Sequence, residues 1–218
     1  MQLPFTAEQF FDVFRAYNTT VWPAQVFLQV LAVAAVALVF FPRRWSSAAI
    51  SAILACLWAW IGVVYHLVFF APINPLAYIF AAASVAGSVL FIWQGVVRRR
   101  LEFRWVFNAR AQVGLGLVVF ALVVYPVWSS LAGHRYPALP TFGLPCPTTL
   151  FTLGLLAFVT MPYPRSPLIV PVLWCFVGAQ AALLLGVHAD LGLVVAGLFG
   201  IVLFARPGSV KQSRRATL

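Results

Sequence analysis

The chain has 218 residues, of which 63% are hydrophobic and only 8% are charged. Too few polar side chains are present to cover a water-soluble globule, so the composition excludes a soluble domain and indicates an integral membrane protein. The formal net charge is +10, but the basic residues do not form a separate patch interleaved with aromatic residues, which excludes a nucleic-acid partner. Membrane lipid is the expected partner, and attraction to anionic lipid accounts for the basic charge.

Residues 1–21 precede the first long apolar run and are predicted to form a short amphipathic helix on the outer leaflet. Residues 6–9 match a capping box, the pattern that begins many helices. Phe10, Phe14 and Tyr17 are spaced so that they share one face of such a helix. A helix with one apolar face is typical of the membrane interface, so we expect this segment to lie flat there.

Seven apolar runs follow in a predicted transmembrane domain, residues 22–205, and each is expected to cross the membrane as an α-helix. About 20 apolar residues are needed to span a hydrocarbon core of roughly 30 Å. The runs are 22–41, 48–70, 75–97, 111–131, 148–161, 168–185 and 191–205. Because the fifth and seventh runs are short, their outer ends are predicted to stop below the surface and leave an outward-facing recess.

Basic residues occupy alternate gaps between these runs, and this alternation predicts the orientation. Arginine and lysine beside membrane spans are retained on the cytoplasmic side. Only Arg15 and Arg135 lie elsewhere. The topology anchors are Arg43, Arg44, Arg98, Arg99, Arg100, Arg165 and Arg206, and residues 206–218 form a basic tail. The predicted fold is an all-α integral membrane protein, a seven-transmembrane-helix bundle with its N-terminus outside and its C-terminus inside.

Most reactive side chains fall on the predicted outer side, where we expect any site. Cys146 lies between two prolines at the N-cap of the short fifth helix, where the helix dipole favours a thiolate. The loop 132–147 is rich in Pro and Gly, which predicts an ordered lid over the recess. The ligand-binding candidates are Cys146, His134, His66, Asn74 and Thr148. Each also has a structural interpretation, such as a small buried Cys146, or a His66 that stacks on aromatic rings and bonds Asn74.

A transition-metal site is a second interpretation of the same residues. Zinc in proteins takes about four nitrogen, oxygen or sulfur ligands. The candidates are Cys146, His134, His66, His188 and Asp190, although Asp190 is also a good N-cap for the last helix. No HExxH motif and no pair of histidines four residues apart is present, so the site depends on tertiary packing. No cofactor is assigned from the sequence.

Three functional hypotheses follow. The first is a receptor or carrier that binds or passes a small ligand or a soft metal ion, with Cys146 and His134 as contacts and Cys56 and Cys175 deeper in the path. The second is a membrane enzyme that uses a metal or a thiol on a lipid or periplasmic substrate. The third is a structural subunit of a membrane complex. The ligand and the oligomeric state stay open, and a homo-oligomer is compatible with the sequence.

Several short motifs spread along the chain resemble a known family. They are Leu3-Pro4-Phe5-Thr6 with Gln9-Phe10, Tyr17-Asn18 before Trp22-Pro23, Tyr65-His66 with Phe69-Phe70, Ile73-Asn74-Pro75, Thr141-Phe142-Gly143 and Pro145-Cys146-Pro147-Thr148-Thr149. This pattern resembles an uncharacterised family of small bacterial multi-spanning proteins, a domain of unknown function. The resemblance covers nearly the whole chain and implies a multi-pass protein of the bacterial inner membrane, but it assigns no catalytic residues.

Overall fold

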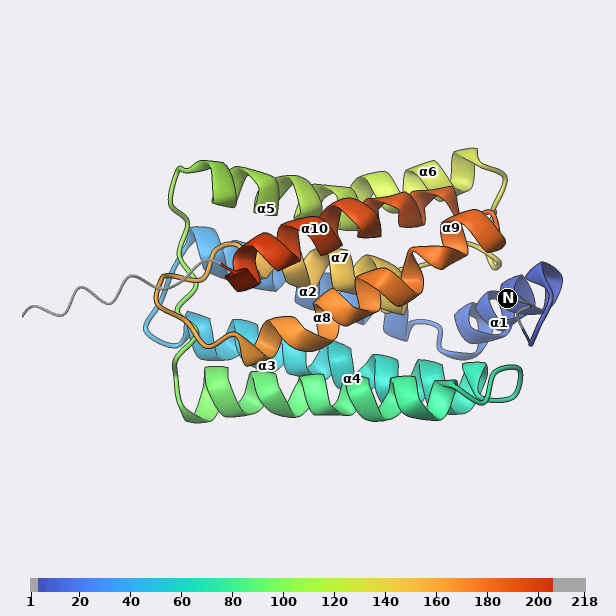
Figure 1. Ribbon diagram of the computed structural model, residues 1–218, viewed down its shortest axis with the longest axis horizontal. Helices are drawn as coiled ribbons and strands as arrows, with labels where there is room; N and C mark the ends of the chain where they lie inside the picture. Colours follow the sequence, from blue (N-terminus) through green and yellow to red (C-terminus); the bar gives the residue numbers. More distant parts are fainter. Residues whose placement is uncertain (1–3, 206–218) are drawn as a thin grey trace, which may run out of the picture.

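The computed structural model describes residues 4–205, which form a bundle of helices with no strand apart from isolated bridges (Figure 1). The predicted tail 206–218, including Arg206, lies outside the described residues. The elements in chain order are α1 (Ala7–Thr20), α2 (Ala24–Phe40), α3 (Ser46–Trp60), η1 (Ile61–Phe70), α4 (Ala77–Phe91), η2 (Ile92–Val97), α5 (Ala109–Val119), η3 (Phe120–Val124), α6 (Tyr125–Leu131), α7 (Pro145–Leu156), α8 (Ser166–Gly178), α9 (Gln180–Leu184), η4 (His188–Asp190) and α10 (Leu191–Ala205).

Five continuous helical stretches are long and apolar enough to cross a membrane. They are Ser46–Phe70, Ala77–Val97, Ala109–Leu131, Ser166–Leu184 and His188–Ala205. A sixth is counted if α1 and α2, which meet at 86°, are taken as one broken span. Apolar side chains also cover the outside of the bundle, for example Ile79 and Leu198, as expected where lipid is the solvent. All seven predicted runs form helices, but only five or six pass as spans by length and composition.

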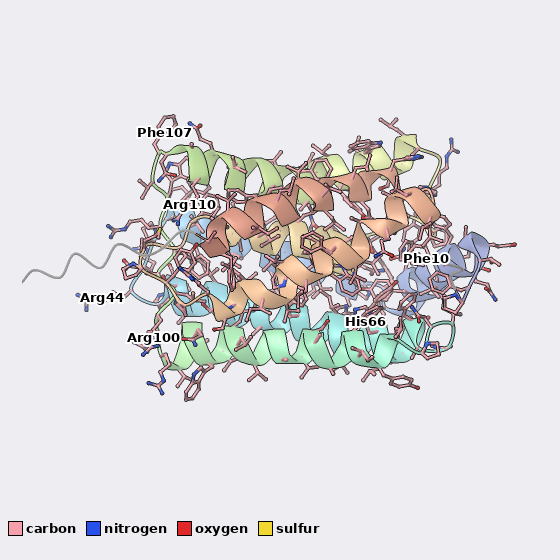
Figure 2. The ribbon with its side chains drawn as sticks, viewed as in Figure 1. Phe10, Arg44, His66, Arg100, Phe107 and Arg110 are labelled. Carbon is pink, nitrogen blue, oxygen red and sulfur yellow. The ribbon has the colours of Figure 1, made fainter. Side chains whose placement is uncertain are left out.

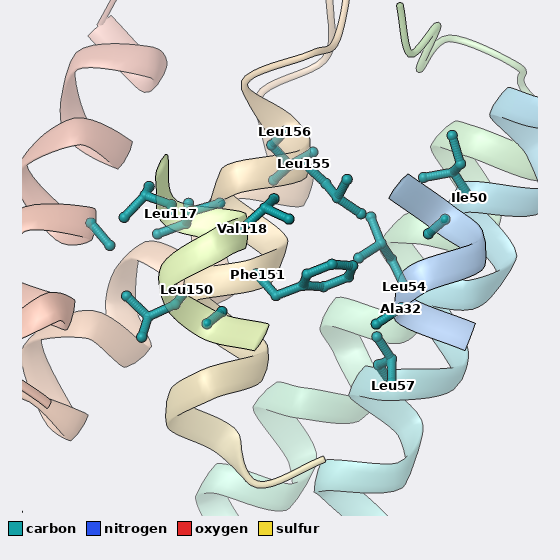
Figure 3. Close-up of a cluster of buried hydrophobic side chains, with 14 of the residues drawn as sticks. Ala32, Ile50, Leu54, Leu57, Leu117, Val118, Leu150, Phe151, Leu155 and Leu156 are labelled. Carbon is teal, nitrogen blue, oxygen red and sulfur yellow. The ribbon is translucent and has the colours of Figure 1, made fainter. Parts of the chain in front are cut away.

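The predicted run that is too short to pass as a span forms α7, which lies in the middle of the bundle. It has only 12 residues, so it rises roughly 18 Å, and every residue in it except Cys146 is buried. A helix that is apolar on all sides is typical of a buried position. Figure 3 shows Phe151 of α7 extending towards Leu54 of α3 and Ala32 of α2.

Close packing of α5 against α7 depends on glycine. A Cβ atom at Gly114 would lie 2.4 Å from the Cβ of Ala157 and 2.7 Å from the carbonyl oxygen of Gly154. Neither Gly114 nor Gly154 has room for a larger side chain, so the two helix backbones are in direct contact. Small residues are used in this way where membrane helices approach closely.

The N-terminal helix α1 lies across one end of the bundle, at 86° to α2 (Figure 1). The predicted capping box is confirmed, because the N–H of Gln9 donates to Thr6 Oγ1 and the N–H of Thr6 donates to Gln9 Oε1. The face that carries Phe10, Phe14 and Tyr17 is buried against η1 and its neighbours. The expectation that this face enters the lipid is therefore wrong, since protein already covers it.

The two ends of the bundle differ in charge. Arg44, Arg100 and Arg110 lie at the end opposite α1, whereas Phe10 marks the α1 end (Figure 2). The connections α2–α3, α4–α5 and α7–α8 carry the arginines of this end, and α7 runs from the α1 end towards them. The predicted separation of basic from reactive residues is thus a feature of the folded chain.

Candidate functional site

An apolar cavity of about 380 Å³ lies at the α1 end of the bundle. Its walls come from α1, η1, α4, α8 and α9, together with the loop that leads into α7. The lining residues are Pro4, Phe5, Phe10, Phe14, Tyr65, Phe70, Asn74, Leu76, Phe80, Tyr125, Pro140, Leu144, Pro145, Cys146, Pro147, Trp174, Val177, Gly178, Gln180, Ala181, Leu184 and Leu185. The cavity is found at the starts of the third and fifth predicted runs, where the sequence predicts a recess, and its walls are mainly apolar.

Aromatic rings close the end of the cavity. The ring of Phe5 lies 5.5 Å from that of Phe70, and Phe10 lies 4.6 Å from Phe14 between ring centroids. Tyr17 is fully buried below them, and its hydroxyl accepts a hydrogen bond of 2.8 Å from Trp60 Nε1. Such ring pairs prefer tilted and edge-to-face packing and add to the stability of the cap. The cap of the cavity is therefore α1, and the loop 132–147 supplies one wall.

A polar cluster lies at the inner side of the cavity. The hydroxyl of Tyr125 donates to Asp190 Oδ1 at 2.6 Å, and the carboxylate is only 1% exposed. The thiol of Cys146 interacts with the same carboxylate. Tyr125 and Cys146 line the cavity, so the cluster places one buried acidic group next to an apolar space. Buried polar groups of this kind in a membrane protein are candidates for function.

Local structure places Cys146 differently from the sequence prediction, whereas Asp190 directly precedes the last helix as expected. The N-cap of α7 is Leu144, and Cys146 follows in the first turn between Pro145 and Pro147. Asp190 ends the short helix η4 just before α10, and its carboxylate binds the hydroxyl of Tyr125. Proline is tolerated in the first turn because the N–H groups there have no helical partner. The expected N-cap position of Cys146 is therefore wrong.

His66 lies behind the aromatic wall of the cavity. It is 0% exposed, and neither ring nitrogen has a hydrogen-bond partner among the described residues. Its ring centroid lies 5.0 Å from that of Trp174 and 5.6 Å from that of Phe80. The predicted bond to Asn74 is absent from the described residues, since Asn74 Oδ1 accepts the backbone N–H of Leu76 instead. A buried imidazole without a partner is costly, so a ligand or a water molecule that bonds it would stabilise this end.

Trp174 brings His66 and Cys146 into one neighbourhood. Its indole Nε1 is buried and interacts with the thiol of Cys146, as the carboxylate of Asp190 does. A Cβ atom added at Gly178 would lie 3.1 Å from Trp174 Nε1 and 3.3 Å from Cys146 Sγ, so both groups surround that glycine. The indole N–H is a donor that can serve the thiol or a polar group of a ligand inside the cavity.

Asn18 fixes the loop that forms the remaining wall. Its amide nitrogen donates to the carbonyl oxygens of Pro137 and Leu139 at 2.6 and 2.7 Å, and its Oδ1 accepts from Thr141 Oγ1 at 2.6 Å. Asn18 is itself 0% exposed. Gly143 has a φ of 98° and would meet the hydroxyl of Tyr17 at 3.0 Å if it carried a Cβ, which only glycine tolerates readily. The loop is thus held in place from α1.

The remaining predicted site residues do not join the cluster. His134 stacks on Phe11 with 4.3 Å between ring centroids, and His188 is exposed. Thr148 is fully buried in α7, and its hydroxyl has no hydrogen-bond partner among the described residues. Cys56 is exposed on α3, outside the residues that line the cavity, so the proposed row of three thiols is not formed.

A metal site is not assembled from these groups. Within residues 4–205, no three His, Cys, Asp or Glu side chains come together in a group that could hold a metal ion. Of the five predicted metal ligands, only Cys146 and Asp190 interact. A carboxylate beside the thiol also repels a thiolate, whereas reactive cysteines have positive surroundings. The carboxylate therefore disfavours an activated nucleophile at Cys146.

A family model matches residues 7–215, which include the arginine end and every residue of the cavity lining except Pro4 and Phe5. The chain belongs to DUF6064, a family of unknown function. The resemblance to an uncharacterised family is thereby confirmed. No curated protein and no solved structure matches the chain. The function of this DUF6064 protein must therefore be argued from its own geometry.

Tyr125, Trp174 and Asn18 are the site residues that sequence reasoning did not single out. Tyr125 and Trp174 each lie inside a long apolar run, where aromatic residues are common, and Asn18 lies in a helix cap region. The one available signal was that tyrosine and tryptophan carry a hydrogen-bonding group, which needs a partner when the side chain is buried. Their shared role depends on contacts between segments distant in the sequence.

Proposed function

We propose that this DUF6064 protein binds a small amphiphile in the cavity beneath α1, as a membrane receptor or carrier. The ligand would place its apolar part among the aromatic side chains and its polar group at the Tyr125–Asp190–Cys146 cluster. The observation that carries the proposal is a buried carboxylate at the side of an apolar cavity. Small-molecule sites are concave and mainly apolar, with a few polar groups that orient the ligand.

Access from the lipid side supports this choice of ligand. Leu76, Val177 and Leu184 line the cavity and are also 39 to 52% exposed on the outside of the bundle. The cavity is therefore closest to the hydrocarbon between α4 and the α8–α9 segment. A ligand dissolved in the membrane could enter there without passing the aromatic cap. The carboxylate favours a hydrogen-bond donor, such as a hydroxyl or an amine, over another acid.

The proposed membrane topology has seven crossings with the N-terminus outside and the C-terminus inside. Each of the seven predicted runs connects the cavity end with the arginine end, and α7 does so inside a ring of longer helices. Retention of basic residues on the cytoplasmic side then places the cavity outside, in an inner membrane if the host is a bacterium. Under this topology, the amphiphile is bound in the outer half of the bilayer.

Photolabelling of the full chain in lipid nanodiscs tests the proposal. The probes are three long-chain diazirines with the same chain and an alcohol, an amine or a carboxylate as the polar group. We expect the alcohol and the amine to label peptides of the cavity wall, and the carboxylate to label them about tenfold less, a difference equivalent to roughly 1.4 kcal/mol. Labelling spread evenly over lipid-exposed helices would contradict a binding site.

A pair of neighbouring leucines supplies the control. Leu184 lines the cavity, whereas Leu183 is 82% exposed and does not line it. Leu184→Trp should fill the opening and abolish labelling of the cavity wall, and Leu183→Trp should leave it unchanged. Asp190→Asn should remove the preference for the amine over the carboxylate. Equal labelling of both tryptophan variants would mean that the cavity is not the labelled site.

A further inference from the structure

A groove of about 640 Å³ lies at the other end of the bundle, independent of the cavity. Two connections form it, the one between α2 and α3 and the one between η2 and α5. Its lining residues are Pro42, Arg43, Arg44, Trp45, Ser47, Ala48, Gly95, Arg99, Leu101, Glu102, Phe103 and Arg104. Four arginines from two separate segments, Arg43, Arg44, Arg99 and Arg104, therefore line one concave space.

The positive charge of this groove is not neutralised by the protein. None of the four lining arginines forms an ion pair among residues 4–205. Glu102 is the one carboxylate in the lining. Its Oε2 accepts a 3.4 Å hydrogen bond from the hydroxyl of Thr160, and no arginine of residues 4–205 forms an ion pair with it. The groove is thus a preformed site for an anion.

The backbone of the connection between η2 and α5 is held by three hydrogen bonds to two other segments, α3 and the α7–α8 connection. The N–H of Phe103 donates to Ser47 Oγ at 3.1 Å, that of Thr160 donates to the carbonyl oxygen of Glu102 at 2.8 Å, and that of Arg104 donates to the carbonyl oxygen of Phe158 at 2.9 Å. The side chain of Phe103 is also buried. The arginines therefore extend from a fixed support, which lowers the entropy lost when they bind a ligand.

Arg99 adds an observation that general membrane electrostatics does not explain. It has a φ of 49°, and it follows η2 in a helix-ending turn in which the N–H of Arg100 donates to the carbonyl oxygen of Gln94. Glycine is the usual residue at this position, because other residues are strained in the left-handed region. Basic charge near the membrane could be supplied at unstrained neighbours such as Arg98. The strained backbone indicates that the Arg99 side chain is needed in this place.

We infer that this groove binds the phosphate group of an anionic phospholipid. Arginine matches phosphate because its planar group donates parallel hydrogen bonds. A phospholipid is favoured over a soluble phosphate as the ligand because Trp45, which lines the groove, is 60% exposed, and the nearby Phe41 is 74% exposed. Aromatic side chains of this kind lie at the membrane interface, where they contact the upper part of acyl chains. A bound lipid would join the α2–α3 and η2–α5 connections.

Native mass spectrometry of the purified chain with added phosphatidylglycerol tests the inference. The double variant Arg99→Gln/Arg104→Gln removes two arginines of the groove, and the matched variant Arg98→Gln/Arg100→Gln removes two adjacent arginines that do not line it. We expect the groove variant to lose affinity by roughly fivefold per arginine. The matched variant should stay within about twofold of the unchanged chain, as expected for charges outside the site.

Three results would overturn the inference. Equal losses in the two double variants would assign the effect to overall charge, and no loss in either would exclude the groove. Displacement of the lipid by millimolar inorganic phosphate would show that a soluble anion is the ligand. Misfolding is separated from loss of binding by Arg99→Lys, which keeps the charge but not the parallel hydrogen bonds and should lose less affinity than the groove double variant. A thermal melt of each variant in the absence of lipid checks that it is folded.

Discussion

The two ends of the bundle contrast in how they are built. The α1 end is held together by aromatic contacts and buried hydrogen bonds, and it encloses a carboxylate, an imidazole and a thiol in an apolar surrounding. The arginine end is exposed, and it is held by backbone bonds under a layer of charge. The first arrangement suits a ligand that comes from the hydrocarbon, and the second suits a phosphate at the membrane surface. A polar side chain therefore affects the stability of the fold more at the buried α1 end than at the exposed arginine end.

The largest expected effect is the all-or-none accessibility of the two ends from outside the cell. In a chain whose three native cysteines are replaced by alanine, Ala132→Cys reports on the α1 end and Phe107→Cys on the arginine end. A membrane-impermeant maleimide should label Ala132→Cys in intact cells and Phe107→Cys only after permeabilisation, because basic connections stay in the cytoplasm. Labelling in the opposite order would reverse the proposed topology and move the cavity to the inner half of the membrane.

The next effect compares asparagines at the two ends. Asn18→Ala removes a buried side chain with three short hydrogen bonds, so it should lower the free energy of unfolding by roughly 3 kcal/mol. Asn108→Ala removes only the N-cap of α5, an exposed position, and should cost about 1 kcal/mol. Thermal unfolding in detergent measures both. Protease cleavage at Arg135 should increase only in Asn18→Ala, and equal cleavage in the two variants would show that Asn18 does not hold the loop.

A smaller effect is expected from the buried tyrosine of the polar cluster. Tyr125→Phe leaves the Asp190 carboxylate without its 2.6 Å hydrogen bond and should destabilise the protein by about 2 kcal/mol. Tyr78→Phe, at a side chain that is 62% exposed, is the control and should change the stability by less than about 0.5 kcal/mol. The two variants are compared by thermal unfolding at one pH. An unchanged stability of Tyr125→Phe would show that the pair is not part of the structural core.

The smallest effect has the opposite sign. Arg99→Gly relieves the positive φ and should stabilise the lipid-free chain by up to about 1 kcal/mol. The same variant should bind phosphatidylglycerol more weakly, because one groove arginine is lost. A rise in melting temperature combined with weaker lipid binding would show that the strain at Arg99 is retained because its side chain binds the lipid. A fall in melting temperature without lipid would contradict the strain argument.

The comparison also shows why some residues could be found from the sequence and others could not. The capping box at Thr6 and Gln9 was predictable because it depends on hydrogen bonds within one turn. The link from Tyr125 to Asp190 joins residues 65 positions apart, and the one from Asn18 to Thr141 joins residues 123 apart. No local pattern encodes such pairs. His134 was expected near Cys146 because both lie in one loop, but the structure places it on Phe11 instead.

The sequence by itself determined that this protein is helical and apolar enough for a membrane, where its helices begin and end within a few residues, and which connections carry the arginines. These properties follow from hydropathy, helix capping and charge, which act over short distances along the chain. Only the tertiary structure decided that α7 is the buried centre, that α1 closes a cavity, and that four arginines share one groove. Those features depend on which helix faces meet, and in an almost uniformly apolar sequence shape and small residues determine that choice.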